Sequence, residues 1–429
     1  MHSKLAQKKL AQKVMVKLPL LLLSTLVIFS SSLSAAEVTQ LDESLVSVDN
    51  RSTEQRNVGI KQAFDNVVLK NSGLQSALKN PLVVAKHNDP NALMTQYGYQ
   101  EKEGQLYLKV NFDNRRIVDL LRQANLPVWG KQRPLTLIWL VSDDDNGQRQ
   151  IISDESTSQI KSDFSRQADN RGMPFLFPLM DLDDSMRISV SDVRGMFVDT
   201  VAQASRRYQA DFFIMASIAN SSNGVDYTLN LYSKMGDGVS SAPLVSISSD
   251  AQNVDSAISA MMAKVSEYYV DQYAAVDSGS QLMTKVTFSG VNTIKQMVDL
   301  EHYIEQLRAI KSAQLVQMKG DTVTYDFSLF STQADLFRVM DLEPRLTPLS
   351  KAAEPKMAAM SDTSLENNTA SYSAYSDSGS DSNSGYASSN RGATLGRGMD
   401  TSLSAGTPTE SQNGVSAPVA ATIYQWKGH

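Results

Sequence analysis

The chain has 429 residues and no cysteine, which excludes disulfides, thiol nucleophiles and zinc–thiolate sites. Its formal charge is −6, from 40 basic and 46 acidic residues, and five of the lysines lie before residue 18, so the remainder carries −11. This acidic balance disfavours nucleic acid as a partner, because phosphate binding needs a positive face. The most basic stretches, RQADNR and SRRYQ, are interpreted as solvated helix ends.

Residues 1–36 are predicted to be a secretory signal peptide. The lysines precede an apolar run, LPLLLLSTLVIF, and the small residues Ser34 and Ala36 follow it. The run is shorter than the roughly 20 residues that a membrane-spanning helix needs, so cleavage after Ala36 is favoured over an uncleaved anchor. We therefore expect a periplasmic protein that has no membrane span after cleavage.

Residues 37–130 are predicted to form a small α+β domain with the element order βααββα. SLVSVD indicates a strand, and the helix that follows ends at Asn71-Ser72-Gly73. Ile60, Ala63, Phe64, Val67 and Val68 recur along that helix at helical spacing. A hairpin then turns at Glu103-Gly104 and leads to a short helix near residue 117.

Residues 131–276 are predicted to form an α/β domain with a mixed sheet. PLTLIWLVS is uniformly apolar, which indicates a central strand, and QIIS returns beside it. A short buried strand follows Arg171, and a helix that begins at Ser191 is expected to bury Phe197. Three consecutive strands, ADFFIMASIA, VDYTLNLYSK and APLVSISS, precede a helix over 254–273.

Residues 277–349 are predicted to form a small βαββα domain with a hairpin turn at Gly320-Asp321. The predicted fold class is therefore α/β (α+β), with two or three small mixed-sheet units that carry helices on their sheets. Residues 350–416 are rich in Ser and Gly and are predicted to be disordered, because they cannot bury enough apolar surface.

Residues 417–429 regain an apolar pattern after the Ser-rich segment. Thr422, Tyr424 and Trp426 alternate with Ile423 and Gln425, which is typical of a strand. Two interpretations stay open. The segment docks as an edge strand on the third domain, or it is a recognition peptide that adds a strand to a partner's sheet.

Few residues suggest catalysis. His87 and His302 are interpreted as solvated, and two isolated histidines cannot form the usual zinc triads. DDDNG at 143–147 fails the calcium-loop pattern, because Ser153 stands where a bidentate Glu is needed, so it is interpreted as a hairpin turn. The weak catalytic candidates are Asp181, Asp183 and Asp184, which follow a predicted strand, where active-site loops often lie. The alternative interpretation is a solvated acidic loop that precedes a helix. No metal site and no cofactor is predicted.

A second group of side chains is predicted to lie at a binding site or a domain interface: Trp129, Arg133, Trp139, Arg171 and Tyr208. Pro127 ends one helix and Pro134 precedes a central strand, so Trp129 lies where a large ring can fill a seam between two domains. We therefore expect Trp129→Ala to destabilise the protein more than Trp426→Ala.

Three motifs occur in order along the chain: VWGKQRPLTLIWL, RGMPFLFPLMDLDD and ASRRYQADFFIMASI. With them the chain resembles, over about residues 42–349, the exported bacterial family called domain of unknown function 2066. The resemblance implies no catalytic residues, because no activity is established for that family. The middle unit is also similar in outline to small α/β domains of envelope assembly proteins, an analogy that does not fix function.

The sequence therefore favours a non-enzymatic accessory or assembly protein that acts through contacts with envelope proteins. This expectation rests on two features of the sequence: it predicts several small α/β units, and it contains no recognisable set of catalytic residues. Two alternatives stay open. One is a hydrolase or metal-dependent enzyme that uses the Asp181–Asp184 loop, and the other is a small-molecule or glycan binding module.

Overall fold

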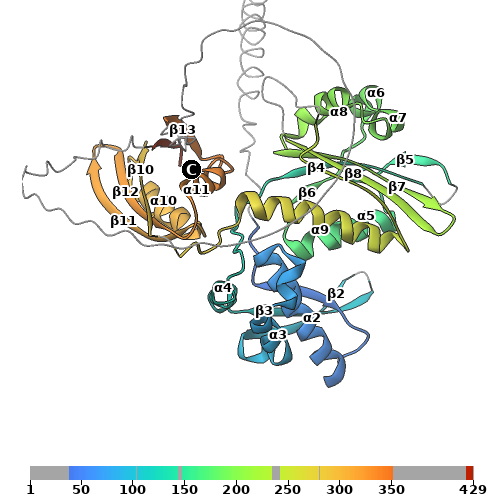
Figure 1. Ribbon diagram of the computed structural model, residues 1–429, viewed down its shortest axis with the longest axis horizontal. Coiled ribbons are helices and arrows are strands. Elements are labelled where there is room, and N and C mark those ends of the chain that lie inside the picture. The colour runs from blue at the N-terminus through green and yellow to red at the C-terminus, as the bar shows by residue number, and fades with distance from the viewer. Residues whose placement is uncertain are drawn as a thin grey trace, which may run out of the picture. The chain divides into compact units, whose positions relative to one another are not determined.

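The computed structural model describes residues 38–102, 104–143, 147–233, 242–279, 281–350 and 422–428 (Figure 1). Helices and strands are mixed throughout and build three sheets, which confirms the predicted fold class. The predictions for 1–36, for the turn at 144–146 and for nearly all of 350–416 lie outside the described residues. None of the helices within the described ranges is both long and apolar enough to cross a membrane.

The first sheet has the strand order β1-β3-β2, and both pairings are antiparallel. Its strands are β1 (Glu43–Ser47), β2 (Met94–Lys102) and β3 (Gln105–Phe112). The helices of this region are α2 (Thr53–Ser72), α3 (Pro81–Asn88) and α4 (Asn114–Gln123), with short 3₁₀ turns η1 (Gln75–Lys79) and η2 (Pro90–Ala92).

Helix α2 supplies five buried residues to the core beneath this sheet. Ser52 caps its first turn by accepting a hydrogen bond from the Gln55 N–H. The helix ends at Gly73, whose φ of 70° suits glycine, and a Cβ there would lie 2.2 Å from Val270 of a later helix. The five apolar residues singled out at helical spacing are all buried.

The second sheet has the order β5-β4-β7-β8-β9, with β6 also paired to β4. Its strands are β4 (Thr136–Asp143), β5 (Arg149–Ile151), β6 (Phe175–Leu176), β7 (Phe212–Ser221), β8 (Gly224–Ser233) and β9 (Val245–Ala251). β4 runs parallel to β6 and β7, and the other pairings are antiparallel. β4 is interior and almost wholly buried, as its uniform hydrophobicity indicates.

Helices cover both faces of the second sheet (Figure 1). They are α5 (Gln159–Arg171), α6 (Leu182–Arg187), α7 (Val190–Arg194), α8 (Val198–Ser205), the 3₁₀ turn η3 (Arg206–Tyr208) and α9 (Val254–Tyr273). Ile138 and Leu140 of β4 belong to the cluster that includes α5 and α9, whereas Leu137 and Trp139 belong to the cluster that includes α7 and α8. The alternation along β4 therefore serves two cores.

The single helix predicted from Ser191 is wrong. Ser189 caps α7 in a capping box with Asp192, and the chain then breaks at Met196, whose φ is 55°, before α8 begins. The break turns Phe197 outward, where it is 56% exposed instead of buried. The short strand β6 is half-buried rather than buried.

The third sheet has the order β11-β12-β10-β14-β13. Its strands are β10 (Leu282–Ser289), β11 (Ile310–Lys319), β12 (Thr322–Leu329), β13 (Leu346–Ser350) and β14 (Thr422–Trp426), with helices α10 (Ile294–Gln306) and α11 (Gln333–Met340). β14 is parallel to β10 and antiparallel to β13. It is therefore an interior strand, and the predicted edge position is wrong.

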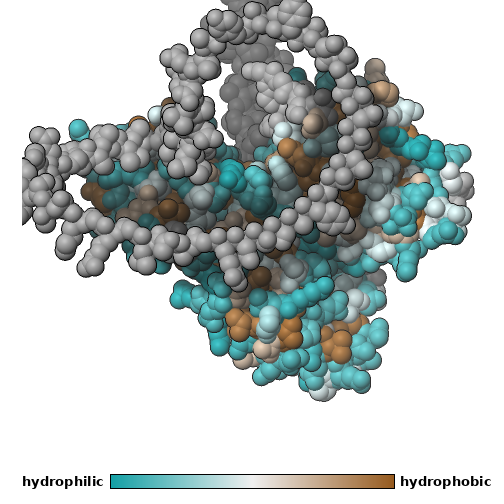
Figure 2. Space-filling model, in the orientation of Figure 1, coloured by the Kyte–Doolittle hydropathy of each residue, from teal (hydrophilic) through white to brown (hydrophobic). Residues whose placement is uncertain are grey.

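The surface around the first sheet is mostly hydrophilic, with small hydrophobic areas (Figure 2). Val58 on α2 and Leu82 and Val84 on α3 are exposed. Scattered apolar side chains of this kind are normal on a protein surface, so they indicate no docking site.

Candidate functional site

The three aspartates of the 181–184 loop differ in exposure: the Asp184 side chain is buried, whereas those of Asp181 and Asp183 are 44% and 53% exposed. Asp181 is the N-cap of α6 and accepts a hydrogen bond of 3.1 Å from the Asp184 N–H. Asp184 is fully buried and accepts hydrogen bonds from the Met180 N–H, at 3.0 Å, and from the Tyr208 hydroxyl. The loop therefore begins a helix, as the solvated-loop interpretation expected, and Asp181 and Asp183 are exposed, whereas the buried Asp184 anchors a tyrosine.

Arg207, which the sequence interpretation treated as part of a solvated helix end, joins these carboxylates. Its guanidinium lies 2.7 Å from Asp181, 3.0 Å from Asp184 and 3.5 Å from Asp183. Burial and the hydrogen bond to Asp184 raise the pKa of Tyr208. The cluster thus ties α6 to the end of α8 by charge-assisted hydrogen bonds.

The remaining polar candidates lie elsewhere. His87 pairs with Asp65 at 2.7 Å, and Arg171 donates to the Gln167 side chain at 2.7 Å, so neither joins the aspartate loop. Within the described ranges, no group of three or more His, Asp or Glu side chains is arranged to hold a metal ion. Asp181 and Asp184 are already engaged by Arg207, so the geometry does not present them as a free pair for acid–base chemistry.

We expect the Asp181 carboxyl group to titrate near pH 2 in the folded protein. The hydrogen bond from Arg207, followed by that from the Asp184 N–H, lowers its pKa from 3.8 to about 2. Since the folded pKa is depressed, the stabilisation from Asp181 is complete above about pH 3.8 and is lost as the pH falls through about 2. Carboxyl NMR titration measures this value directly, and Arg207→Gln should return it toward 3.8.

Arg187→Gln is the matched control for that titration, because Arg187 pairs with Asp183 and not with Asp181. It should leave the Asp181 pKa near 2. If the pKa of Asp181 stays near 2 in Arg207→Gln, Arg207 does not bind this carboxylate in solution.

Trp129 and Arg133 lie together where the end of α2 approaches α9. Trp129 is fully buried, and its backbone N–H donates to the Asn71 carbonyl at 2.7 Å. Its ring centroid lies 6.2 Å from that of Tyr269 on α9, and the Arg133 guanidinium lies 4.1 Å from the Trp129 ring centroid. A cation–π contact in a water-free setting is stabilising by about 2 kcal/mol.

Arg133 is buried without a carboxylate partner. Its guanidinium donates to five backbone carbonyls, those of Lys70, Trp129, Gly130, Arg171 and Gly172, at 2.5 to 3.2 Å. The carbonyls at Lys70 and Arg171 end α2 and α5, where the helix dipole is negative, so one cation caps two helices. Burial lowers the pKa of Arg133 to about 9, which keeps the side chain charged at neutral pH.

Trp139 and Tyr208 lie on the other side of the second sheet. The Trp139 Nε1–H donates to Ser205 Oγ at 2.9 Å, and its ring meets Tyr208 edge-on at 6.1 Å between centroids. The five residues predicted at a binding site or interface are therefore divided. Trp129, Arg133 and the carbonyl of Arg171 meet at the α2–α9 joint, and Trp139 and Tyr208 meet beside the aspartate cluster.

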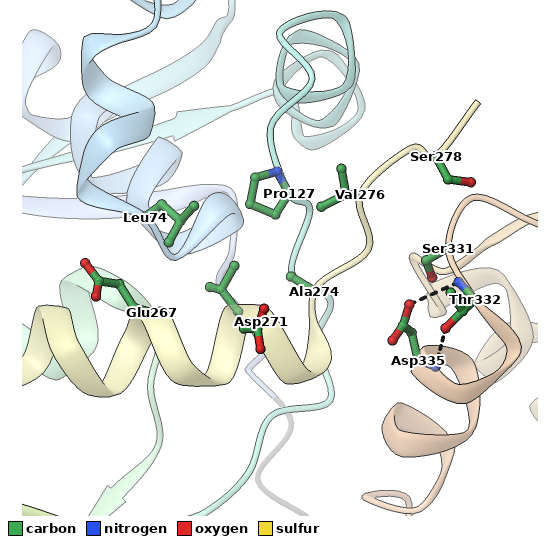
Figure 3. Close-up of a pocket in the computed structure, with 11 residues that line it drawn as sticks. Leu74, Pro127, Glu267, Asp271, Ala274, Val276, Ser278, Ser331, Thr332 and Asp335 are labelled. Carbon is green, nitrogen blue, oxygen red and sulfur yellow. Dashed lines mark hydrogen bonds between the residues drawn. The ribbon is translucent and has the colours of Figure 1, made fainter. Parts of the chain in front are cut away.

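A groove with a volume of about 520 Å³ opens beside the α2–α9 joint (Figure 3). Its apolar lining consists of Leu74, Pro127, Val270, Ala274 and Val276. Its polar lining consists of Glu267, Asp271, Ser278, Ser331, Thr332 and Asp335. We call this the α9–α11 groove. Its wall comes from segments near residues 74, 127, 270 and 332, so no local sequence motif could reveal it.

The polar groups of the α9–α11 groove have one sign of charge. Glu267, Asp271 and Asp335 supply three carboxylates, and no basic side chain lines the groove. Asp335 also caps α11 and pairs with Arg338 at 2.8 Å, as Figure 3 shows for the cap. Ser331 is 5% exposed, and its Oγ has no hydrogen-bond partner in the described structure. A buried hydroxyl of this kind can still donate or accept one hydrogen bond, to a water molecule or to a ligand group.

The chain is an α+β protein with three sheets, and two uncharacterised families match parts of it. Residues 282–363 match the family DUF2066, which confirms the family resemblance. The three motifs that suggested it lie outside this range, so the predicted extent of 42–349 is not what the match covers. Residues 35–130 match a domain of unknown function (DUF8605), a family that the sequence interpretation missed. No curated protein and no solved structure matches the chain.

Proposed function

We propose that this is an exported periplasmic protein that serves as a non-enzymatic accessory or assembly protein of the cell envelope. It acts through protein–protein contacts, and the α9–α11 groove is a contact site. The observation that carries the proposal is the composition of that groove, with an apolar floor beside three carboxylates and an orphaned hydroxyl.

The composition of the groove favours a protein segment over a small metabolite. A protein surface patch offers apolar side chains for Leu74, Val270 and Val276, and lysine or arginine for the acidic rim. No aromatic side chain lines the groove, so the stacking platform expected of a glycan site is absent from this lining. The periplasmic part of the proposal rests on the signal-peptide pattern of residues 1–36.

Site-specific photo-crosslinking in intact cells tests the contact site. A photoreactive residue at Val276, which is 45% exposed in the groove, should give a discrete crosslinked protein. The control is the same residue at Val58 on α2, which is 59% exposed and outside the groove. Adding Glu267→Lys to the Val276 probe should weaken the crosslink by about tenfold, because a reversed rim charge repels a basic partner.

Equal crosslinking from Val276 and Val58 would count against the groove as a contact site. The same cells test the location, because the mature chain should appear in the periplasmic fraction with Glu37 as its first residue. A full-length chain in the cytoplasmic fraction would refute the location and leave the groove experiment to be judged separately.

A further inference from the structure

The third sheet is completed by a segment from the far end of the chain. Among the described strands, β13 pairs with β14 alone, and β14 separates it from β10. Without β14, the sheet would have an open slot between these two strands. We call this the β10–β13 slot. Open strand edges accept added strands readily, because each carries a row of unpaired N–H and C=O groups.

Buried side chains hold β14 in the slot. The Tyr424 ring lies 6.4 Å from that of Phe288 and 6.1 Å from that of Phe337, between centroids. The Trp426 ring lies 5.7 Å from that of Tyr303, and Arg345 lies 5.0 Å from the Trp426 ring centroid. The slot therefore recognises an extended segment with aromatic side chains at alternate positions, which is β-strand addition with side-chain pockets.

The backbone of the slot is also shaped for the incoming strand. Lys427 N–H donates to the Arg345 carbonyl at 2.9 Å, just beyond the end of β14. Gly290, with a φ of 85°, follows β10, and a Cβ there would lie 2.7 Å from the Trp426 carbonyl oxygen. Glycine at this position thus permits the close approach of the strand end.

The residues that match the DUF2066 family include both strands that border the slot, but not the strand that fills it. The DUF2066 match covers residues 282–363, which include β10 and β13, and ends before β14 begins at Thr422. The segment that the family defines therefore contains the acceptor strands, and the strand that fills the space between them comes from outside it.

We propose that the β10–β13 slot is a strand-exchange site. The β14 segment of a second copy replaces the chain's own β14, so that each copy completes the third sheet of the other. The second copy is the fitting partner because it carries the one segment whose fit the structure shows, with Thr422, Tyr424 and Trp426 buried. About 70 residues connect β13 to β14, and this tether raises the effective concentration of the chain's own β14, so exchange between copies is favoured at high protein concentration.

The first experiment tests whether β14 can be replaced after the chain between β13 and β14 has been cleaved. A protease site inserted between residues 351 and 421 allows β14 to be separated covalently while it stays in the folded protein. A fluorescent peptide of residues 419–429, in excess, should then enter the slot and raise the fluorescence anisotropy. A Gln425→Ala peptide should compete as well as the native one, because Gln425 is exposed, whereas a Trp426→Ala peptide should compete about a hundredfold less well.

The second arm uses intact chains. Two copies with different tags, mixed at high protein concentration, should form mixed dimers by native mass spectrometry, and chains without residues 421–429 should form none. Failure of the peptide to enter the cut protein would overturn the proposal. Mixed dimers that persist without residues 421–429 would overturn it too, as would an intact protein that stays monomeric at every concentration.

Discussion

Replacing Trp426 with alanine should destabilise the protein by about 3–5 kcal/mol, the range for truncating a large buried aromatic residue. Trp426 is 2% exposed and Trp129 is 0% exposed, so the structural reason for expecting Trp129→Ala to be the more damaging change is gone. Trp426 also packs on Tyr303 and under Arg345, so its loss leaves a cavity in the core of the third sheet. We expect the two alanine variants to be destabilised to a similar extent.

Urea unfolding followed by circular dichroism measures both variants. Gln425→Ala is the matched control on the same strand, because the Gln425 side chain faces solvent and a surface substitution changes stability by about 0.5 kcal/mol or less. Deletion of residues 421–429 should destabilise the protein more than either point substitution does, since β13 then loses its strand partner. If Trp426→Ala unfolds at the same urea concentration as Gln425→Ala, β14 does not occupy the slot in solution.

The strong periodic signals of the sequence predicted individual elements well. Helix α9 occupies the predicted residues 254–273, because its apolar residues recur at helical spacing without interruption. β4 is interior as predicted, because only a strand buried on both faces is uniformly apolar. Elements whose pattern arises within their own residues can thus be recognised without tertiary information.

Other features depend on contacts between distant residues and were missed. The alternation in residues 422–426 predicts a strand, but its interior place depends on open edges of β10 and β13 that no local pattern encodes. The break between α7 and α8 at Met196 requires a positive φ in a residue that rarely adopts one, so its sequence is consistent with one continuous helix.

The candidate sites show the same limit. Asp181 and Asp184 attracted attention as a carboxylate pair, but Arg207, some 25 residues later in the chain, determines their environment. The α9–α11 groove carries no motif, because its lining comes from four separate segments. Sequence alone singled out Trp129 and Arg133, since their neighbourhood is unusually rich in aromatic residues and prolines, but it could not show that a guanidinium meets five carbonyls there.

Arg133→Met should destabilise the protein by at least about 3 kcal/mol, because it leaves several buried carbonyls without a donor at once. The acceptors include the carbonyls at Lys70 and Arg171, so the last turns of α2 and α5 should fray first.

Arg133→Lys should recover only part of the loss, since an ammonium has three donors at a single point and cannot reach acceptors arranged around a planar guanidinium. The control is Arg194→Met, an exposed arginine at the end of α7, which should change stability by about 0.5 kcal/mol or less.

Urea unfolding measures the change in the free energy of unfolding for each variant. Hydrogen exchange at the Gly73 and Gly172 amides, which lie at the ends of α2 and α5, shows whether these helix ends open. If Arg133→Met and Arg194→Met are equally stable, and exchange at both helix ends is unchanged, Arg133 does not hold the two helices together. If Arg133→Lys is as stable as the wild type, the positive charge at this position matters and the planar geometry of the guanidinium does not. The expected order, with wild type the most stable, then Lys, then Met, follows because the joint needs five directed hydrogen bonds from one side chain, and only arginine has that many donors.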